Sequence, residues 1–292
     1  MKKNISNIVI FRLSSIGDII LTSTLVRCLR SKFPDAKIDF VVKRQFRHIT
    51  ELMPEIDTIH TFNSDGGFSE LLSLRSKLAS KKYDVMLDIH KNWRSAFIRN
   101  TIGARRVYTY NKHTFKRYMM IRFKIDAYHI VRPVYLRFVD AAQKLGAVYD
   151  NKKTGLTIPA DTQKHVDNYL EDHGIKPHKP LVVLCPGASF YNKEWQKEKF
   201  LELAQKVITQ KNMQVVLLGG SKEQETCTYI ATTINQKILS VAGQFNLKES
   251  AALLNRAQAT VANDTGMLHM SEALKVPVVG MTIWLFSYIR KK

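Results

Sequence analysis

Short apolar runs alternate with amphipathic stretches along almost the whole chain, and this alternation constrains the fold more than any other feature. The runs are four to seven residues long, rich in Val, Ile and Leu, and bounded by polar or glycine-containing segments, as in NIVIFRL and LVVLC. Such runs are typical of buried parallel strands, and the stretches between them carry apolar residues at helical spacing. Strands that alternate with helices predict βαβ units, so we expect an α/β fold with parallel sheets.

The same pattern gives approximate bounds for each element. Strands are expected at residues 7–13, 38–42, 56–62, 83–89, 181–185, 214–218, 259–262 and 276–279. Helices are expected at residues 19–32, 69–80, 134–145, 163–173, 197–210, from about 223, 247–255 and 267–274. The alternation restarts after the polar stretch YDNKKTGLTIPAD at residues 149–161, whose Gly and Pro favour a linker.

Two successive α/β halves therefore predict two domains, residues 1–150 and residues 160–292. With 45% hydrophobic residues, the chain has enough apolar side chains for two buried cores. In sheets of this kind, ligands bind outside the carboxyl ends of the strands. We expect a cleft between the two halves, lined by the loops that follow their strands.

The net charge of +20, from 45 Lys and Arg against 25 Asp and Glu, narrows the class of partner. Between residues 91 and 137 there are twelve Lys or Arg and a single acid, Asp126, with aromatic residues interleaved. A basic stretch can be an ordinary solvated surface. The near absence of acids here favours an anionic partner instead: nucleic acid, an anionic membrane face or a phosphorylated substrate.

Cysteine spacing and hydropathy exclude other classes. Cys28, Cys185 and Cys227 lie far apart, and no CxxC pair or His/Cys ligand spacing predicts a disulfide framework or a zinc site. No apolar span reaches the roughly 18–20 residues that a transmembrane helix needs, and the N-terminal apolar run is too short for a signal peptide. These features favour a cytoplasmic protein, at most bound to a membrane surface.

The loop RLSSIGD at residues 12–18 follows the first expected strand and could carry chemistry. Gly17 permits close approach of a ligand, and the helix after it presents free N–H groups. Asp18 could act as a general base toward a substrate hydroxyl. It could equally cap the helix, because Ser15 and Asp18 have the spacing of a capping box.

Two strand-end loops in the second half could bind phosphate. In PGASFYNKEW, Ser189 can donate a hydrogen bond and Lys193 offers a point charge, although Lys193 could be an ordinary loop lysine. In NDTGMLH, Thr265 and Gly266 can donate to a diphosphate at a helix N-terminus. Alternatively, Asp264 only caps the helix, and His269 is a buried histidine whose hydrogen bonds are satisfied.

A further loop, GGSKE at residues 219–223, ends with Glu223, which could accept hydrogen bonds from ribose hydroxyls or could be an acid at a helix start.

Five motifs, taken in order along the chain, resemble the ADP-heptose:lipopolysaccharide heptosyltransferases, glycosyltransferase family 9. They are RLSSIGDIILT, YDVMLDIH, PGASFYNKEW, LLGGSKEQE and ANDTGMLHMSEAL. The resemblance covers about residues 7–279 and implies the GT-B fold, two Rossmann-like domains facing a central cleft. It also implies inverting, metal-independent transfer of a sugar from a nucleotide diphosphate, and the chain contains no Asp-x-Asp pair.

Carried over residue by residue, the resemblance assigns roles to the strand-end loops. Asp18 matches the catalytic base, and no cofactor or metal ligand is implied. The implied donor-binding residues are Lys193, Glu223, Asp264, Thr265, Gly266, Met267 and His269, and Ser189 joins them as a hydroxyl donor in the same loop as Lys193. The expected acceptor contacts are Ser15, Gly17, Arg94 and Arg117. His90 stands where many members have glutamine and receives no role.

The resulting expectation is a glycosyltransferase that moves a heptose or related sugar from an ADP-sugar to a phosphorylated lipopolysaccharide precursor. It would work at the inner face of the cytoplasmic membrane, in peripheral contact with anionic lipid. An epimerase of the same fold would leave the basic region without a purpose. A nucleic-acid-binding protein is the alternative from another class, but no helix-turn-helix, RNP or zinc-finger pattern occurs.

The tail after Val279 departs from the family pattern. Members continue with a Gly-Pro loop and further helical stretches, whereas this chain continues with GMTIWLFSYIRKK, which is apolar and then basic. A truncation or frame change is one hypothesis, and it would leave the C-terminal domain shortened and the protein a nucleotide binder with impaired catalysis. An amphipathic membrane contact is the alternative.

Overall fold

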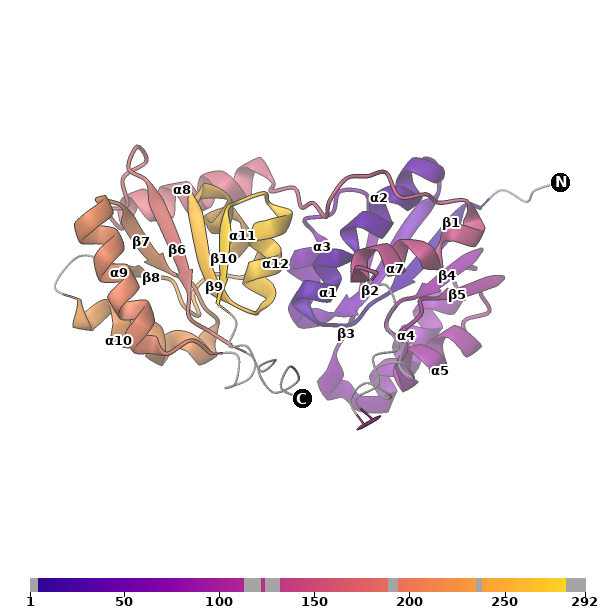
Figure 1. The fold of residues 1–292 in the computed structure, drawn as a ribbon. Coiled ribbons are helices and arrows are strands. Elements are labelled where there is room, and N and C mark those ends of the chain that lie inside the picture. The colour runs from indigo at the N-terminus through magenta and orange to yellow at the C-terminus, as the bar shows by residue number, and fades with distance from the viewer. Residues whose placement is uncertain (1–4, 113–121, 124–131, 189–193, 235–237, 282–292) are drawn as a thin grey trace. The chain divides into compact units, whose positions relative to one another are not determined.

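The computed structural model describes residues 5–112, 122–123, 132–188, 194–234 and 238–281 (Figure 1). The chain divides into two compact units, Met1–Thr154 and Gly155–Lys292. The division falls within the polar stretch at residues 149–161. Among the helices in the described ranges, none combines the length and the apolar composition needed to cross a membrane.

The first unit is built on a five-stranded sheet with the order β3-β2-β1-β4-β5. Its strands, all paired in parallel, are β1 (Asn7–Phe11), β2 (Lys37–Lys43), β3 (Thr58–Phe62), β4 (Val85–Asp88) and β5 (Arg106–Thr109). Its described helices are α1 (Ile16–Leu21), α2 (Ser23–Lys32), α3 (Arg47–Thr50), α4 (Gly67–Ala79), α5 (Trp93–Thr101) and α7 (Val134–Ala141), with 3-10 turns η1 (Arg44–Phe46), η2 (Ser64–Gly66) and η3 (Gln143–Leu145).

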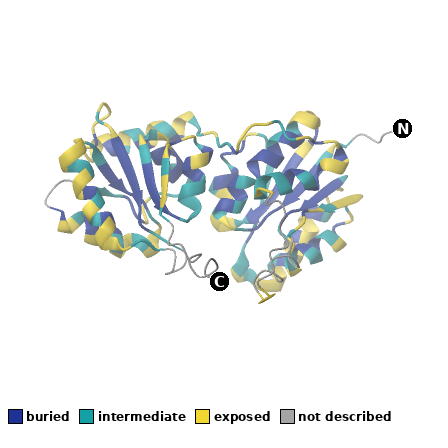
Figure 2. Ribbon diagram, in the orientation of Figure 1, coloured by how far each residue is buried: buried dark blue, intermediate teal, exposed yellow. Residues whose placement is uncertain are grey.

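The central strands of this sheet are buried on both faces, as Figure 2 shows. Val9 pairs with Asp39 of β2 on one side and with Met86 of β4 on the other. On one face, Val9 and Met86 join a core completed by apolar residues of α4 and α5. The near-continuous apolar runs of β1 and β4 reflect this double burial, because helices cover both faces of a parallel sheet.

The second unit repeats this plan with the strand order β10-β9-β6-β7-β8. Its parallel strands are β6 (Leu181–Cys185), β7 (Gln214–Leu217), β8 (Leu239–Ser240), β9 (Ala259–Asn263) and β10 (Val278–Met281). Its described helices are α8 (Ala160–Asp172), α9 (Lys197–Lys211), α10 (Gln224–Thr233), α11 (Leu247–Arg256) and α12 (Gly266–Ala273), with the 3-10 turn η5 (Ser221–Glu223). The expected α/β architecture of parallel sheets is confirmed.

Both sheets therefore have the same connectivity. In each, the first strand lies at the centre, the next two strands extend the sheet to one side, and the last two extend it to the other. The first unit thus has a topological switch point between β1 and β4, and the second has one between β6 and β9. Ligands in such sheets bind at the carboxyl ends of the strands that flank the switch point.

Some element bounds differ from expectation. The single helix expected at residues 19–32 is two helices, α1 and α2, that meet at Thr22, whose hydroxyl donates to the carbonyl of Asp18 at 2.8 Å. Neither α5 nor β5 was expected. Most of β5 is exposed at the sheet edge and lacks an alternating apolar pattern, which is why the sequence does not reveal it.

The last strand also begins and ends later than expected. Residues 276–279 were predicted, whereas β10 spans Val278–Met281 and pairs with β9 along its length. Gly280 and Met281, which the sequence assigns to the atypical tail, are therefore part of the second sheet. The rest of that tail, residues 282–292, lies outside the described residues.

Candidate active site

A buried arginine spans the switch point of the first unit. Arg12 directly follows β1 and is only 6% exposed. Its guanidinium donates through Nη1 to the carbonyl of Ile89, just beyond β4, and contacts the carboxylate of Asp18 through Nη2. One side chain thus ties the end of β1, the end of β4 and the first turn of α1 together.

Asp18 has contacts that fit both roles considered from the sequence, a helix cap and a general base. Its Oδ2 accepts hydrogen bonds from the Ser15 hydroxyl at 3.1 Å and from the Ser15 amide at 3.4 Å, so it does cap the start of α1. The same carboxylate pairs with Arg12. Its side chain remains 34% exposed, so a substrate hydroxyl can reach it. Gly17, in the same turn, is buried.

The surroundings of Asp18 are cationic. Lys112 follows β5 and donates to the carbonyl of Lys91 at 2.8 Å. Burial and the neighbouring charge of Arg12 lower the pKa of Lys112. Burial, followed by the charges of Arg12 and Lys112, also lowers the pKa of His90 to about 4, so this imidazole is neutral near pH 7. An edge this rich in positive charge favours a substrate that carries negative charge.

The loop that carries His90 is anchored by a fully buried carboxylate at the end of β4. Asp88 accepts hydrogen bonds from the amides of His90 at 3.1 Å and Lys91 at 2.8 Å. It also accepts from the Ser95 hydroxyl at 2.9 Å and from Arg99 at 3.1 Å. A buried carboxylate with four donors is well satisfied, so Asp88 fixes the loop and the start of α5.

Of the two arginines expected to contact the acceptor, one is described. Arg94, on α5, has its guanidinium 4.6 Å from the ring centre of Trp93 and 5.9 Å from that of Phe62. These cation–π contacts hold Arg94 beside the carboxyl ends of β3 and β4. Arg117 lies outside the described residues.

In the second unit, a buried asparagine spans the switch point. Asn263, the last residue of β9, is fully buried and donates through Nδ2 to the carbonyl of Pro186 at 2.7 Å, just beyond β6. Its Oδ1 accepts from the amide of Trp195 at 3.1 Å. Asn263 therefore holds both ends of the loop that begins at Pro186, and that loop contains Ser189 and Lys193, which lie outside the described residues.

Glu223 packs against this loop and against the end of β7. A Cβ atom added to Gly187 would stand 2.6 Å from Cγ of Glu223, and one added to Gly219 would stand 2.6 Å from its Cβ. The carboxylate accepts a hydrogen bond from the amide of Gly220 at 2.8 Å. Glycine is needed at both positions because the Glu223 side chain occupies the space that any other side chain would fill.

The third expected loop precedes α12. Thr265 takes the extended N-cap conformation, and Gly266 opens the helix, so the first N–H groups of α12 have no intrahelical acceptor. Asp264, Gly266 and Met267 are half-buried. Nδ1 of His269 is buried, and within the described residues it has no hydrogen-bond partner. A buried histidine with all its hydrogen bonds satisfied would have a partner at this nitrogen.

Three residues that organise these edges received no role from the sequence: Arg12, Asp88 and Asn263. Each directly ends or follows an apolar strand, and polar residues at strand ends can be read from sequence. The partner carbonyls of Arg12 and Asn263 cannot, because they lie 77 residues away along the chain, whereas the partners of Asp88 lie within 11 residues of it. Within the described ranges, no group of three or more His, Cys, Asp or Glu is arranged to hold a metal ion.

Comparison with known proteins identifies the family. Residues 71–282 match the model of glycosyltransferase family 9 (heptosyltransferase). Lipopolysaccharide heptosyltransferase 3 of Escherichia coli is 27% identical over 278 residues, which are 91% of this chain and 79% of that protein. Lipopolysaccharide heptosyltransferase 2 of Salmonella typhimurium is 25% identical over 283 residues, 92% of this chain and 80% of that protein.

Solved structures share the fold. A family 9 glycosyltransferase from Veillonella parvula superposes with a TM-score of 0.83 at 22% identity, covering 96% of this chain and 82% of that one. The E. coli heptosyltransferase WaaC with ADP-2-deoxy-2-fluoro heptose superposes with a TM-score of 0.73 at 19% identity, covering 94% and 88%. This likeness confirms the expected GT-B class of fold.

Proposed function

This chain belongs to glycosyltransferase family 9, the heptosyltransferases, and we propose that it transfers a heptose or related sugar from an ADP-sugar to a phosphorylated lipopolysaccharide precursor. The observation that carries the proposal is the Asp18 carboxylate, held by Arg12 and Ser15 at a cationic sheet edge. Relatives named for lipopolysaccharide heptose transfer support the substrate class.

Asp18 is the proposed general base. It accepts the proton of the acceptor hydroxyl while the hydroxyl oxygen bonds to the anomeric carbon of the donor sugar. The bond between that carbon and the diphosphate oxygen breaks, and its electron pair stays with ADP. Attack from the face opposite the leaving group inverts the anomeric centre. The Arg12 contact fixes the carboxylate, so the base meets the hydroxyl in one orientation.

The proposed donor site is formed by the strand-end loops of the second unit. The free N–H groups of Thr265, Gly266 and Met267 at the start of α12 suit a diphosphate, because a helix N-terminus favours negative charge. Lys193 adds a positive charge for the leaving group, and Ser189 a hydroxyl donor. Glu223 is the proposed partner of the ribose hydroxyls, and its contacts with Gly187 and Gly219 set its position. Asp264 and His269 complete the set.

The cationic edge supports a phosphorylated acceptor. Arg12 and Lys112 follow strands that end at this edge, Arg94 lies in the first turn of α5, and Ser15 and Gly17 line the turn that carries the base. Arg117 is the further proposed acceptor contact. Phosphate groups on the acceptor would neutralise part of this positive charge, which would strengthen binding in a partly buried site.

Peripheral contact with the inner face of the cytoplasmic membrane is also part of the proposal. An aromatic patch, consisting of Phe68, Leu72, Trp93 and Phe97, lies on α4 and α5, next to Arg94. Phe68, Leu72 and Trp93 are 53%, 46% and 59% exposed, and the rings of Phe68 and Phe97 are 5.4 Å apart. Exposed aromatic side chains beside cations suit an anionic lipid surface.

The test of the base is Asp18→Asn, which keeps the shape of the side chain but removes its basicity. We expect transfer, measured as ADP release with acceptor present, to fall by about 10²–10⁴-fold. The dissociation constant for ADP should stay unchanged, because the donor site lies in the other unit. Asp172→Asn, at the end of α8, is the matched control and should keep full activity. Near-normal turnover in Asp18→Asn would remove Asp18 as the base.

Two further assays test the finer claims. Chelation of divalent metals with EDTA should leave turnover unchanged if transfer is metal-independent. A loss of turnover in EDTA that added divalent metal reverses would contradict this. The anomeric configuration of the product, read by NMR, should be opposite to that of the donor. If the unmodified chain binds ADP but transfers nothing to any lipopolysaccharide precursor, the nucleotide-binding alternative is favoured.

A further inference from the structure

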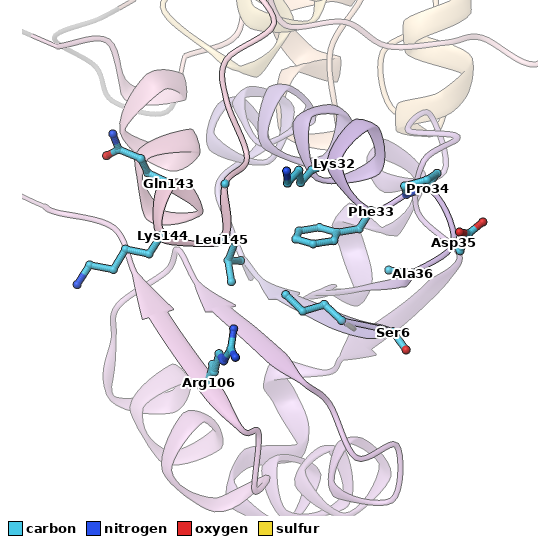
Figure 3. Close-up of a pocket in the computed structure, with 12 residues that line it drawn as sticks. Ser6, Lys32, Phe33, Pro34, Asp35, Ala36, Arg106, Gln143, Lys144 and Leu145 are labelled. Carbon is cyan, nitrogen blue, oxygen red and sulfur yellow. The ribbon is translucent and has the colours of Figure 1, made fainter. Parts of the chain in front are cut away.

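A pocket opens at the amino-terminal edge of the first sheet, opposite the edge that carries Asp18. It has a volume of about 640 Å³ and lies between the start of β1, the turn after α2, the start of β5 and η3. Pockets of this size are typical of small-molecule sites. Figure 3 shows the side chain of Arg106 extending from the start of β5 toward Leu145, with Phe33 beside them.

The cations of this pocket differ from several arginines of the same unit that pair with a carboxylate. Arg27, Arg30, Arg99 and Arg105 each pair with an aspartate. Lys32, Arg106 and Lys144 line the pocket, and within the described residues no carboxylate pairs with any of them. Asp35 is the one acid of the lining, and Figure 3 shows its carboxylate at the rim, directed away from Arg106.

The pocket combines these charges with an apolar floor. Leu145 is buried and Phe33 is half-buried, so both present part of their surface to the cavity. Gly146 has a positive φ of 81°, and a Cβ atom there would stand 3.2 Å from Cε of Lys32. The end of the Lys32 side chain therefore lies close to the backbone of Gly146.

We propose that this pocket binds a phosphate ester that carries an apolar or aromatic substituent. Arg106 presents a fork of donors suited to the oxygens of a phosphate, and Lys32 adds a point charge. Phe33 and Leu145 cover the substituent. The site lies in the first unit at the sheet edge away from Asp18, so it is separate from the proposed base, and none of its lining residues belongs to the proposed ADP-sugar site.

The test uses phenyl phosphate as the probe, titrated calorimetrically into the full chain with ADP present in excess to fill the donor site. The pocket variant is Lys32→Gln with Arg106→Gln. The matched control is Lys77→Gln with Arg105→Gln, which removes the same charge from the same unit outside the pocket. We expect binding to weaken by about tenfold or more in the pocket variant only. Transfer activity should be unchanged in both.

Two comparisons define the ligand further. Phenyl phosphate should bind more tightly than inorganic phosphate, and Phe33→Ser should remove that difference, provided that its melting temperature shows a folded protein. Vesicles of phosphatidylglycerol distinguish the source of the ester. If the pocket variant loses vesicle binding, the natural ligand is a lipid headgroup, and if only phenyl phosphate binding is lost, it is a soluble ester. Equal affinity in the pocket and control variants would overturn the proposal, as would the absence of binding by both probes.

Discussion

Arg12 and Asp18 form an ion pair at the carboxyl edge of the first sheet, with the guanidinium buried and the carboxylate partly open to solvent. The buried partner is also bonded to the carbonyl of Ile89, so it cannot follow the carboxylate if α1 shifts. The pair therefore fixes the position of Asp18 relative to both strands of the switch point. We interpret Arg12 as a positioning residue for the proposed base.

Arg12→Lys keeps the positive charge but loses the planar fork that reaches Ile89 and Asp18 together. We expect kcat to fall by roughly tenfold or more, since a misplaced base is costly, while the dissociation constant for ADP stays the same. A purely structural role would lower the melting temperature without a selective loss of kcat. Arg105→Lys, on an exposed pair with Asp84, is the control. An unchanged kcat in Arg12→Lys would exclude the positioning role.

His90 makes stability depend on pH in a defined window. Its pKa is lowered from 6.5 to about 4 by burial and then by Arg12 and Lys112. Between these two values the unfolded chain binds a proton that the folded protein does not, so the free energy of unfolding falls as the pH drops from 6.5 to 4. With allowance for solvent screening, the loss is on the order of 1–3 kcal/mol. Measured by urea unfolding, the free energy of unfolding of His90→Gln should fall less between pH 6.5 and pH 4 than that of the unmodified chain. Equal slopes against pH in the two proteins would show that His90 is not the source of the pH dependence.

Gly187 and Glu223 should behave as one unit in nucleotide binding. Gly187→Ala places a methyl group 2.6 Å from Cγ of Glu223 and must displace that side chain. We expect Gly187→Ala and Glu223→Ala each to weaken ADP binding by several-fold, and the double variant to be no weaker than either alone. Such non-additivity is expected when two changes remove the same interaction. Additive losses would show that Glu223 does not act through this contact.

Asn263→Ala removes three hydrogen bonds that hold the loop after β6. The carbonyls of Pro186 and Gly187 and the amide of Trp195 would lose their partner inside the protein. Because unsatisfied buried groups cost about 1–3 kcal/mol each, we expect the free energy of unfolding to fall by about 2–4 kcal/mol, with weaker ADP binding. Asn255→Ala, which removes one exposed bond to Gln163, should cost far less. Equal losses in the two variants would contradict the structural role of Asn263.

The aromatic patch predicts a lipid-dependent phenotype. Phe68→Ser with Leu72→Ser should reduce sedimentation with phosphatidylglycerol vesicles by roughly tenfold. Turnover of a soluble, delipidated acceptor should be preserved. Tyr229→Ser, which removes an exposed aromatic residue from α10 in the other unit, is the control. If vesicle binding persists in the double variant, the membrane contact lies elsewhere or the patch binds a protein.

The sequence was sufficient for the fold because double burial leaves a strong signal. The runs that became β1, β4 and β6 are continuous and apolar, and each is fully buried or nearly so. β5 was missed because it lies at an exposed edge and is half composed of polar residues. Its absence from the prediction also hid the position of Lys112, which follows it at the cationic edge.

The candidate site was only partly predictable for a different reason. Motif spacing and the family resemblance predict roles for Asp18, Glu223 and the loop before α12, because these residues lie close together in sequence within their loops. Motif spacing does not predict the hydrogen bond between Arg12 and Ile89 or the one between Asn263 and Pro186, since the partners are 77 residues apart in both cases. Those contacts exist only once the parallel strands are paired, and pairing depends on the whole sheet.

The two sheets share one strand order, and in each a single buried polar side chain joins the strands at the switch point. Among the described residues, the bonds named above at each switch point come from the same half of the chain. Under the proposed function, changes that retune the nucleotide half would then leave the switch point of the acceptor half intact. Under the proposed function, such a protein can acquire a new donor or a new acceptor one at a time, which makes the chain a ready starting point for hybrid enzymes that combine halves from different relatives.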